Sequence, residues 1–139
     1  SLPKREIIIL GVSDDFAFGE KIKNISPNDI TNLCGKTTLE DAARIIQSAR
    51  VVISNDSGLM HLAGFLNKRL IGIFGSTNPH WTQPLGENVT ILQSQISCAP
   101  CYQRSCKYGH YQCLSDISVD MVKKSLESIS SSEMYHSSK

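Results

Sequence analysis

The chain has 139 residues, of which 40% are hydrophobic and 19% charged, a composition typical of one globular domain with a single core. Fourteen Lys and Arg against 13 Asp and Glu give a formal net charge of +1, so no overall field favours nucleic acid or an anionic membrane surface. No apolar run approaches the roughly 20 residues of a membrane-spanning helix, and the opening SLPKRE does not resemble a signal peptide. We therefore expect a soluble chain that is not exported and does not bind nucleic acid.

The first third of the chain predicts a strand, a helix and a short second strand. Residues 7–10 form a continuous apolar run closed by Gly11, which is typical of a central parallel strand covered on both faces. Residues 16–23 predict a short helix that ends before Pro27. Residues 31–33 predict a brief strand.

A second strand–helix alternation follows. Thr37 and Glu40 stand at capping-box spacing and predict a helix start. Apolar residues behind them repeat on one helical face: Leu39, Ala42, Ala43, Ile46 and Ala49. Residues 51–54 predict a buried strand, residues 55–58 its exit turn, and residues 59–66 another apolar-striped helix.

The remaining residues predict two more strands and a last helix. Residues 70–74 form a strong strand followed by the small-residue loop 75–79, and residues 89–92 form another strand. The last helix is predicted to begin at Ser118 and to bury four apolar side chains: Val119, Val122, Leu126 and Ile129. The serine-rich residues 128–139 have little to bury and predict a disordered tail, which leaves residues 1–127 as the domain.

Strands that alternate with helices through short loops predict an α/β fold with a Rossmann-like, doubly wound, mostly parallel sheet. Such sheets bind ligands at the carboxyl ends of their strands, where turns lead into helix N-termini. Three turns are therefore candidate site segments, residues 11–15, 55–58 and 75–79.

The turn at residues 55–58 has the strongest pattern for anion binding. Asp56 and Ser57 are favourable N-cap types, and Gly58 lets a ligand approach backbone N–H groups at the positive end of the helix. His61 lies about one turn into the helix and could reach the same ligand. A phosphate or diphosphate would fit this turn. The alternative is that Asp56 only caps the helix and that His61 is an ordinary surface or core histidine.

Two other segments could contact a phosphate. Gly75 begins a small-residue loop that can expose N–H groups, although Asn78-Pro79 is also an ordinary turn. Gly35-Lys36-Thr37 ends like a P-loop, but Ile30 stands where that motif requires glycine and no strong strand precedes it. The sequence therefore argues against a P-loop nucleoside triphosphatase.

Four of the five cysteines lie in one short segment: Cys98, Cys101, Cys106 and Cys113, with Cys34 far from them. The cluster has enough soft ligands for a tetrahedral structural zinc, although only its first pair has a familiar zinc-ligand spacing. One or two local disulfides, or free thiols in a packed loop, are the alternatives.

The run Asn55 to Ala63, NDSGLMHLA, resembles the signature of the ADP-heptose:lipopolysaccharide heptosyltransferases, glycosyltransferase family 9. Four neighbouring features agree in order and spacing: Gly11 with Asp15, LCGKT at residues 33–37, FGSTNP at residues 74–79, and the cysteine segment through His110 to Cys113. The resemblance covers about residues 6–126 and is greatest for the heptosyltransferase II branch. It implies the GT-B arrangement of two Rossmann-like halves, of which this chain resembles the later part of the C-terminal, donor-binding half.

The resemblance implies a donor site for ADP-heptose or ADP. It assigns the heptose contact to Asp56, the diphosphate contact to the amides at Ser57 and Gly58, the motif histidine to His61, the ribose contact to Asp15 and part of the adenine pocket to Thr37. Gly75 belongs to the same set through its loop. No metal cofactor is required. Neither the first donor-half strand nor the acceptor domain, which carries the proposed general base, has a counterpart in these residues, so we expect no sugar transfer by the chain alone.

The resemblance also implies partners and a location. These are a lipopolysaccharide core acceptor and peripheral attachment at the cytoplasmic face of the bacterial inner membrane. An unpaired sheet edge would allow a homo-oligomer. The residues are also compatible with two other functions: a nucleotide-sugar-binding module without catalysis, and a zinc-stabilised interaction domain.

Overall fold

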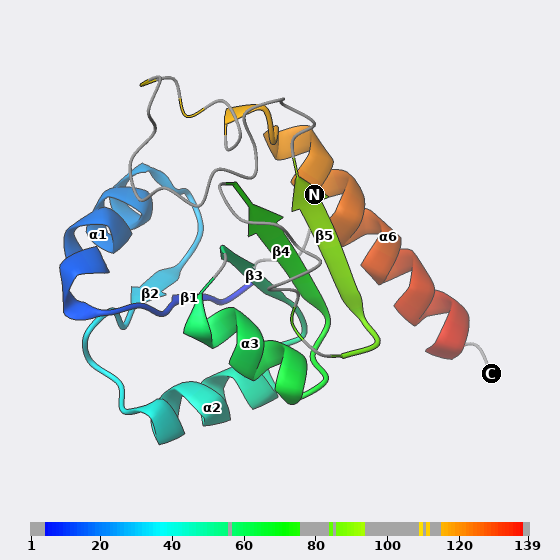
Figure 1. Cartoon of the computed structure of the whole chain (residues 1–139), viewed down its shortest axis with the longest axis horizontal. Coiled ribbons are helices and arrows are strands. Elements are labelled where there is room, and N and C mark those ends of the chain that lie inside the picture. The colour runs from blue at the N-terminus through cyan, green and yellow to red at the C-terminus, as the bar shows by residue number, and fades with distance from the viewer. Residues whose placement is uncertain are drawn as a thin grey trace. The chain divides into compact units, whose positions relative to one another are not determined.

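The computed structural model describes residues 5–55, 57–75, 84, 86–93, 109, 111 and 115–137. The chain divides into two compact units, Ser1–Ile45 and Ile46–Lys139, and each is described by itself. Strands and helices alternate over residues 7–74, and the strand pairs among the described residues are all parallel (Figure 1). The predicted α/β class with a parallel sheet is therefore confirmed.

The first unit contains β1 (Ile7–Ile9), the 3-10 turn η1 (Ser13–Asp15), α1 (Phe16–Ile25) and β2 (Ile30–Asn32). β1 and β2 pair in parallel, and their register runs from Ile7 opposite Ile30 to Ile9 opposite Asn32. Ile7 and Ile8 are each 37% exposed, so the prediction that this strand is covered on both faces was wrong. In the described part of this unit, α1 packs against β2, and β1 has a single strand partner in place of the two that a central strand would have.

Helix α2 (Leu39–Ser48) begins with a capping box that is shifted by one residue from the predicted pair. Asp41 N donates to Thr38 Oγ1 at 3.1 Å, and Thr38 N donates to Asp41 Oδ2 at 3.3 Å. Glu40 instead pairs with Arg44 one turn later, at 2.6 Å. Thr37 therefore precedes the helix cap, and its side chain does not close the predicted box. Ala42 and Ile46 are buried as predicted, whereas Leu39 is exposed.

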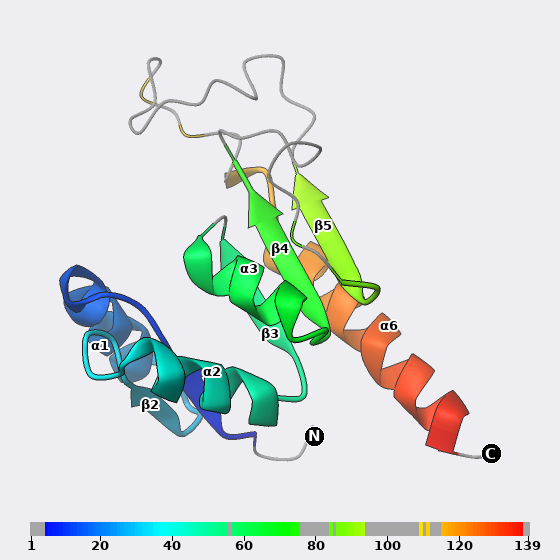
Figure 2. The same cartoon turned by 60° about the horizontal axis from the view of Figure 1, so that its bottom comes forward.

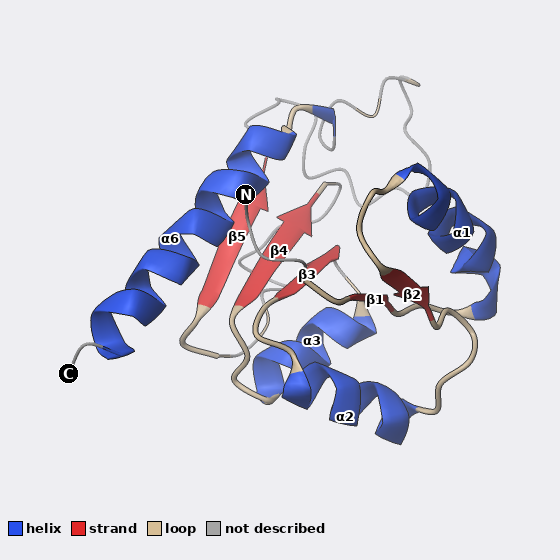
Figure 3. Cartoon of the chain, turned by 180° about the vertical axis from the view of Figure 1, so that it is seen from behind, coloured by secondary structure: helices blue, strands red, loops and turns tan. Residues whose placement is uncertain are grey.

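The second unit contains β3 (Val52–Asn55), α3 (Gly58–Phe65), β4 (Leu70–Phe74), β5 (Val89–Gln93) and α6 (Val119–Ser137). The strands lie in the order β3-β4-β5. Figures 1 and 2 show them side by side, and Figures 1 and 3 show α3 and α6 on opposite faces of this sheet. This arrangement brings the start of α3 to the carboxyl edge of the sheet, directly after β3.

The core of the second unit forms where α3 packs on β4. Leu70, Ile71 and Phe74 are fully buried, as are Met60 and Ala63 on the helix. Fully burying an apolar side chain contributes about 1.5–3 kcal/mol, so this layer fixes the position of the helix start. The apolar side chains predicted for the helix at residues 59–66 thus hold the candidate site in place.

Helix α6 begins as predicted, with Ser118 as its cap. Met121 N donates to Ser118 Oγ at 3.2 Å, and Ser118 N donates to Met121 Sδ at 3.5 Å. Val119 is 75% exposed, which corrects its predicted burial: as the first residue of α6 it lies at the exposed end of the helix. The described backbone stays helical through Ser137, where the sequence predicts a disordered tail. The serine-rich stretch contains no proline or glycine to interrupt the helical hydrogen bonds.

Candidate functional site

Two loops of the first unit meet at the carboxyl ends of β1 and β2. We call residues 11–15 and 33–37 the loop pair. Leu33 N donates to Ile9 O at 2.9 Å and Gly35 N to Gly11 O at 2.9 Å, so hydrogen bonds continue from the strands into the loops. Gly35 has φ +72°, and a Cβ there would lie 2.6 Å from Ser13 Cα. Glycine is therefore required for the two backbones to approach this closely.

Asp15 is held within this loop pair by its own turn. Its Oδ2 accepts from Val12 N at 3.1 Å, and Asp15 N donates to Val12 O at 3.0 Å. A Cβ on Gly11 would lie 2.7 Å from the same oxygen. The side chain is otherwise exposed, and a carboxylate has lone pairs for several donors. The Asp15 carboxylate can therefore accept hydrogen bonds from hydroxyl groups of a ligand while the turn holds it in place.

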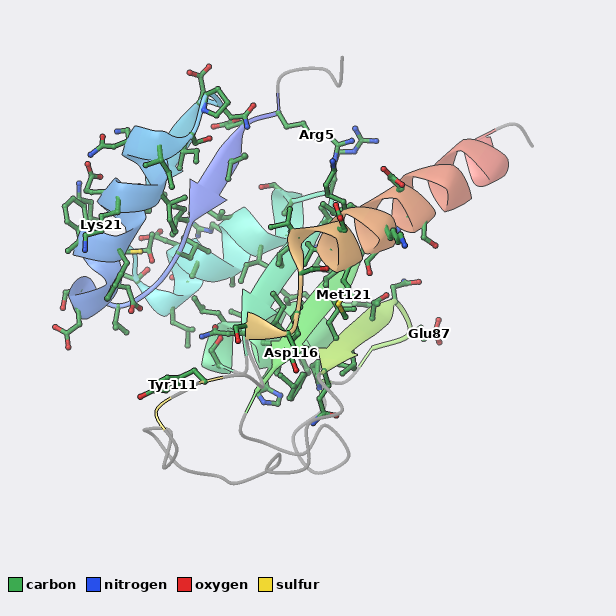
Figure 4. The ribbon with its side chains drawn as sticks, turned by 90° about the horizontal axis from the view of Figure 1, so that it is seen from above. Arg5, Lys21, Glu87, Tyr111, Asp116 and Met121 are labelled. Atoms are coloured by element: carbon green, nitrogen blue, oxygen red, sulfur yellow. The ribbon has the colours of Figure 1, made fainter. Side chains whose placement is uncertain are left out.

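The rim of the loop pair carries an aromatic ring and a cation. Lys36 Nζ lies 4.9 Å from the centroid of the Phe16 ring, a cation–π contact that connects the two loops. Thr37 follows directly and, as the capping geometry of α2 shows, is not used to start that helix. Lys21 makes a second such contact, with Phe18 at 5.5 Å, and Figure 4 shows it on the outer side of α1.

Beneath the loop pair lies Asn32, the buried polar side chain of the described core, which the sequence did not identify. Its Nδ2 donates to Phe16 O and to Glu20 Oε1, both at 3.0 Å, and its Oδ1 accepts from Cys34 N at 3.2 Å. A Cβ on Gly19 would lie 2.5 Å from Oδ1. The one available signal was an asparagine in a predicted strand, and two of its three partners, Phe16 and Glu20, lie 16 and 12 residues away in the sequence.

Cys34 is 2% exposed and lies beside Asp15. Burial raises the pKa of its thiol, the negative charge of Asp15 raises it further, and a backbone hydrogen bond partly opposes them. A thiol with a raised pKa is a poor nucleophile and a poor metal ligand at neutral pH. Cys34 therefore contributes packing to the loop pair and no covalent chemistry.

The start of α3 forms the corresponding region of the second unit. Ser57 is the N-cap: its Oγ accepts from Met60 N at 3.4 Å and lies 3.3 Å from Ser54 Oγ. The N–H groups of Gly58 and Leu59 have no acceptor within the helix. Gly58 is exposed, and a Cβ built on it would meet no atom within 4 Å. No described atom lies within 4 Å of that position, so an anion can approach the positive end of the helix dipole there.

The other predicted donor residues of this unit lie near the same sheet edge. His61 is exposed in the first turn of α3, and its N donates to Ser57 O at 3.4 Å. Gly75 is buried and follows the last residue of β4. Asp56 lies outside the described residues. The structure thus brings Ser57, Gly58 and His61 together in the second unit, and Asp15 together with the segment of Thr37 in the first.

The predicted metal ligands belong to the cysteine segment. Cys98, Cys101, Cys106 and Cys113 lie outside the described residues. Within the ranges given above, no three His, Cys, Asp or Glu side chains are grouped as a metal site. No helix in those ranges is long and apolar enough to cross a membrane.

Figure 4 shows Asp116 and Met121 where the chain enters α6, Glu87 just before β5, and Tyr111 pointing outward.

Residues 5–112 match the pattern of the family described as "Glycosyltransferase family 9 (heptosyltransferase)". The chain belongs to this family. Its relatives include the lipooligosaccharide heptosyltransferase 2 of Haemophilus influenzae, which is 34% identical over 128 residues, covering 88% of this chain and 37% of that protein. The lipopolysaccharide heptosyltransferase 2 of Salmonella typhimurium is 28% identical over 132 residues, covering 92% of this chain and 38% of that protein.

Solved structures agree with this assignment. The structure of E. coli ADP-heptose lps heptosyltransferase II matches with a TM-score of 0.78 at 27% identity, covering 93% of this chain and 37% of that one. A family 9 glycosyltransferase from Veillonella parvula matches with a TM-score of 0.73 at 24% identity and supports the fold alone. The chain therefore spans little more than a third of the relatives it matches, and its predicted Rossmann-like fold is confirmed.

Proposed function

We propose that the chain is the C-terminal, donor-binding part of an inverting heptosyltransferase of GT-B architecture, with ADP-heptose as donor. The observation that carries the proposal is the start of α3, where Ser57 caps the helix and Gly58 leaves open space over exposed backbone amides. The solved relative named for ADP-heptose supports this donor.

The family resemblance assigns parts of a nucleotide sugar to residues of each unit. The backbone amides of Ser57, Gly58 and Leu59 would donate hydrogen bonds to the diphosphate, and His61, in the same helical turn, could contact it from the side. Asp15 would accept hydrogen bonds from the ribose hydroxyls. Thr37 would border the adenine. Asp56 would contact the heptose, and Gly75 would complete the donor site at the end of β4.

In the proposed reaction, an acceptor hydroxyl oxygen forms a bond to the anomeric carbon of the heptose on the face opposite ADP. The bond from that carbon to the diphosphate oxygen breaks, and its electron pair remains on ADP. The acceptor proton passes to a general base, which we assign to the acceptor domain of the complete protein. The amides at the start of α3 would stabilise the negative charge on the departing diphosphate, and no metal is needed for that role.

The further partners follow from the same proposal. The acceptor would be the inner core of a lipopolysaccharide, so the enzyme would act at the cytoplasmic face of the bacterial inner membrane, attached peripherally. The relatives are named for lipooligosaccharide or lipopolysaccharide heptosyltransferase activity. The sequence pattern assigns no cofactor beyond a structural zinc that the cysteine segment could bind.

The test is heptose transfer by the complete protein that carries this chain, with Asp56→Ala as the variant. We expect ADP release and transfer by the unchanged protein, and loss of transfer with retained folding in the variant. Thr31→Ala, an exposed strand position outside the site, is the matched control. Transfer at the unchanged rate by Asp56→Ala would overturn the assignment. ADP binding without any transfer would favour a non-catalytic module, and about one zinc per chain after dialysis without ADP binding would favour a zinc-stabilised interaction domain.

A further inference from the structure

One side chain of the first unit connects every segment of the proposed nucleoside site without facing solvent. Asn32 is 6% exposed and lies at the end of β2. Its Nδ2 is fully used, with one N–H donated to the main chain at Phe16 O and the other to Glu20 Oε1, each at 3.0 Å. Its Oδ1 accepts from Cys34 N at 3.2 Å.

These three contacts fix two different backbones relative to one another. Phe16 follows Asp15 directly, so the bond to Phe16 O holds the end of the turn that carries that carboxylate. Cys34 lies inside the second loop, one residue before Gly35. A shift of the Asn32 amide would therefore move both halves of the loop pair, residues 11–15 and 33–37, at once.

The surrounding packing leaves the amide no alternative position. A Cβ on Gly19 would lie 2.5 Å from Oδ1 and 2.6 Å from Nδ2, so α1 touches Asn32 through a glycine. Leaving a buried donor or acceptor without a partner costs about 1–3 kcal/mol. A carboxylate of the same shape could not donate to Phe16 O and would face the side chain of Glu20.

We propose that Asn32 is a positioning residue for nucleoside binding: its buried amide sets the position of Asp15 and of residues 33–37, and so controls affinity for the nucleoside part of the ligand. This inference rests on the proposed function. Asn32 touches no ligand itself, and its hydrogen bonds go to Phe16, Glu20 and Cys34 and not to the diphosphate amides at Gly58.

The experiment measures binding of ADP, AMP and inorganic pyrophosphate by the complete protein with Asn32→Asp. We expect AMP affinity to fall about tenfold or more, because displaced binding groups lose their contacts, while pyrophosphate affinity changes less than about twofold. Adding Glu20→Gln should restore about threefold of the AMP affinity, because the new amide can donate to the introduced carboxylate. Glu20→Gln alone and the neighbouring Thr31→Ala are the controls.

A merely structural role would give a different result. It would lower the melting temperature while AMP and pyrophosphate affinities stay unchanged, or it would lower both affinities together; either result overturns the inference. If Asn32→Asp does not fold, Gly19→Ala displaces the same amide from the helix side and must show the same AMP-selective loss. Absence of ADP binding by the unchanged protein would instead overturn the proposed function.

Discussion

The loop pair of the first unit and the start of α3 in the second unit differ in how the backbone is used. In the loop pair, the two backbones lie so close that a Cβ built on Gly35 would be 2.6 Å from Ser13 Cα. At the start of α3, Gly58 has open space at the same atom position. Gly35 thus permits a close contact between two backbones, whereas Gly58 leaves a surface accessible to a ligand.

The largest expected effect is on stability, from Gly35→Ala. A φ of +72° and a backbone atom at 2.6 Å both oppose a side chain at this position, so we expect about 2–4 kcal/mol of destabilisation. Chemical denaturation of the variant measures it. A loss below about 1 kcal/mol would show that the loops are not in close contact.

Gly58→Ala should weaken ligand binding without lowering stability. Its Cβ would meet no atom, and alanine favours the helix, so the free energy of unfolding should stay the same or rise by up to about 1 kcal/mol. The methyl group would occupy the open space over the amides, and we expect pyrophosphate affinity to fall about tenfold. Titration calorimetry checks this result. Unchanged affinity would place the anion elsewhere.

Two adjacent threonines of the first unit are predicted to differ in role, one in stability and the other in ligand binding. Thr38 caps α2 through Asp41 N, so Thr38→Ala should cost about 1 kcal/mol of stability and leave AMP affinity unchanged. Thr37→Ala should leave stability within about 0.5 kcal/mol and weaken AMP binding. Denaturation and calorimetry on both variants separate the two roles, and identical behaviour of the two variants would refute the separation.

The reactivity of Cys34 reports on the closed state of the loop pair. Burial, and secondarily the charge of Asp15, raise the pKa of this thiol. The reactive thiolate is therefore scarce below the raised pKa and increases as pH rises through it. Alkylation of Cys34 by iodoacetamide, followed by peptide mass spectrometry, should be slow near neutral pH and should accelerate severalfold in Asp15→Asn. Rapid labelling of the unchanged protein at neutral pH would contradict a buried thiol.

The smallest effect is expected at the exposed ion pair on α2. Glu40 and Arg44 lie 2.6 Å apart, with side chains 75% and 73% exposed. An exposed pair at this helical spacing contributes about 0.3–0.5 kcal/mol, so Arg44→Ala should change stability little and less in high salt. Thermal melts at two salt concentrations test it. A loss above about 1 kcal/mol would mean that Arg44 has a further structural role.

Sequence reasoning predicted the elements with strong periodicity and missed what depends on tertiary contacts. The apolar run of β4 and the Ser57 helix start were identifiable, since each is determined by adjacent residues. The Thr37–Glu40 and Thr38–Asp41 pairs have the same spacing, so only the path of the backbone decides which one caps α2. Asn32 could not be identified, because its partners Phe16 and Glu20 lie 16 and 12 residues away.

The central claim, that the start of α3 binds the diphosphate of a nucleotide-sugar donor, is tested most directly by amide hydrogen exchange in the complete protein with and without ADP. We predict that ADP slows exchange at residues 11–16, 33–37 and 57–61, and leaves helix α6 unchanged over residues 119–129. No slowing at residues 57–61, or slowing confined to α6, would contradict the account.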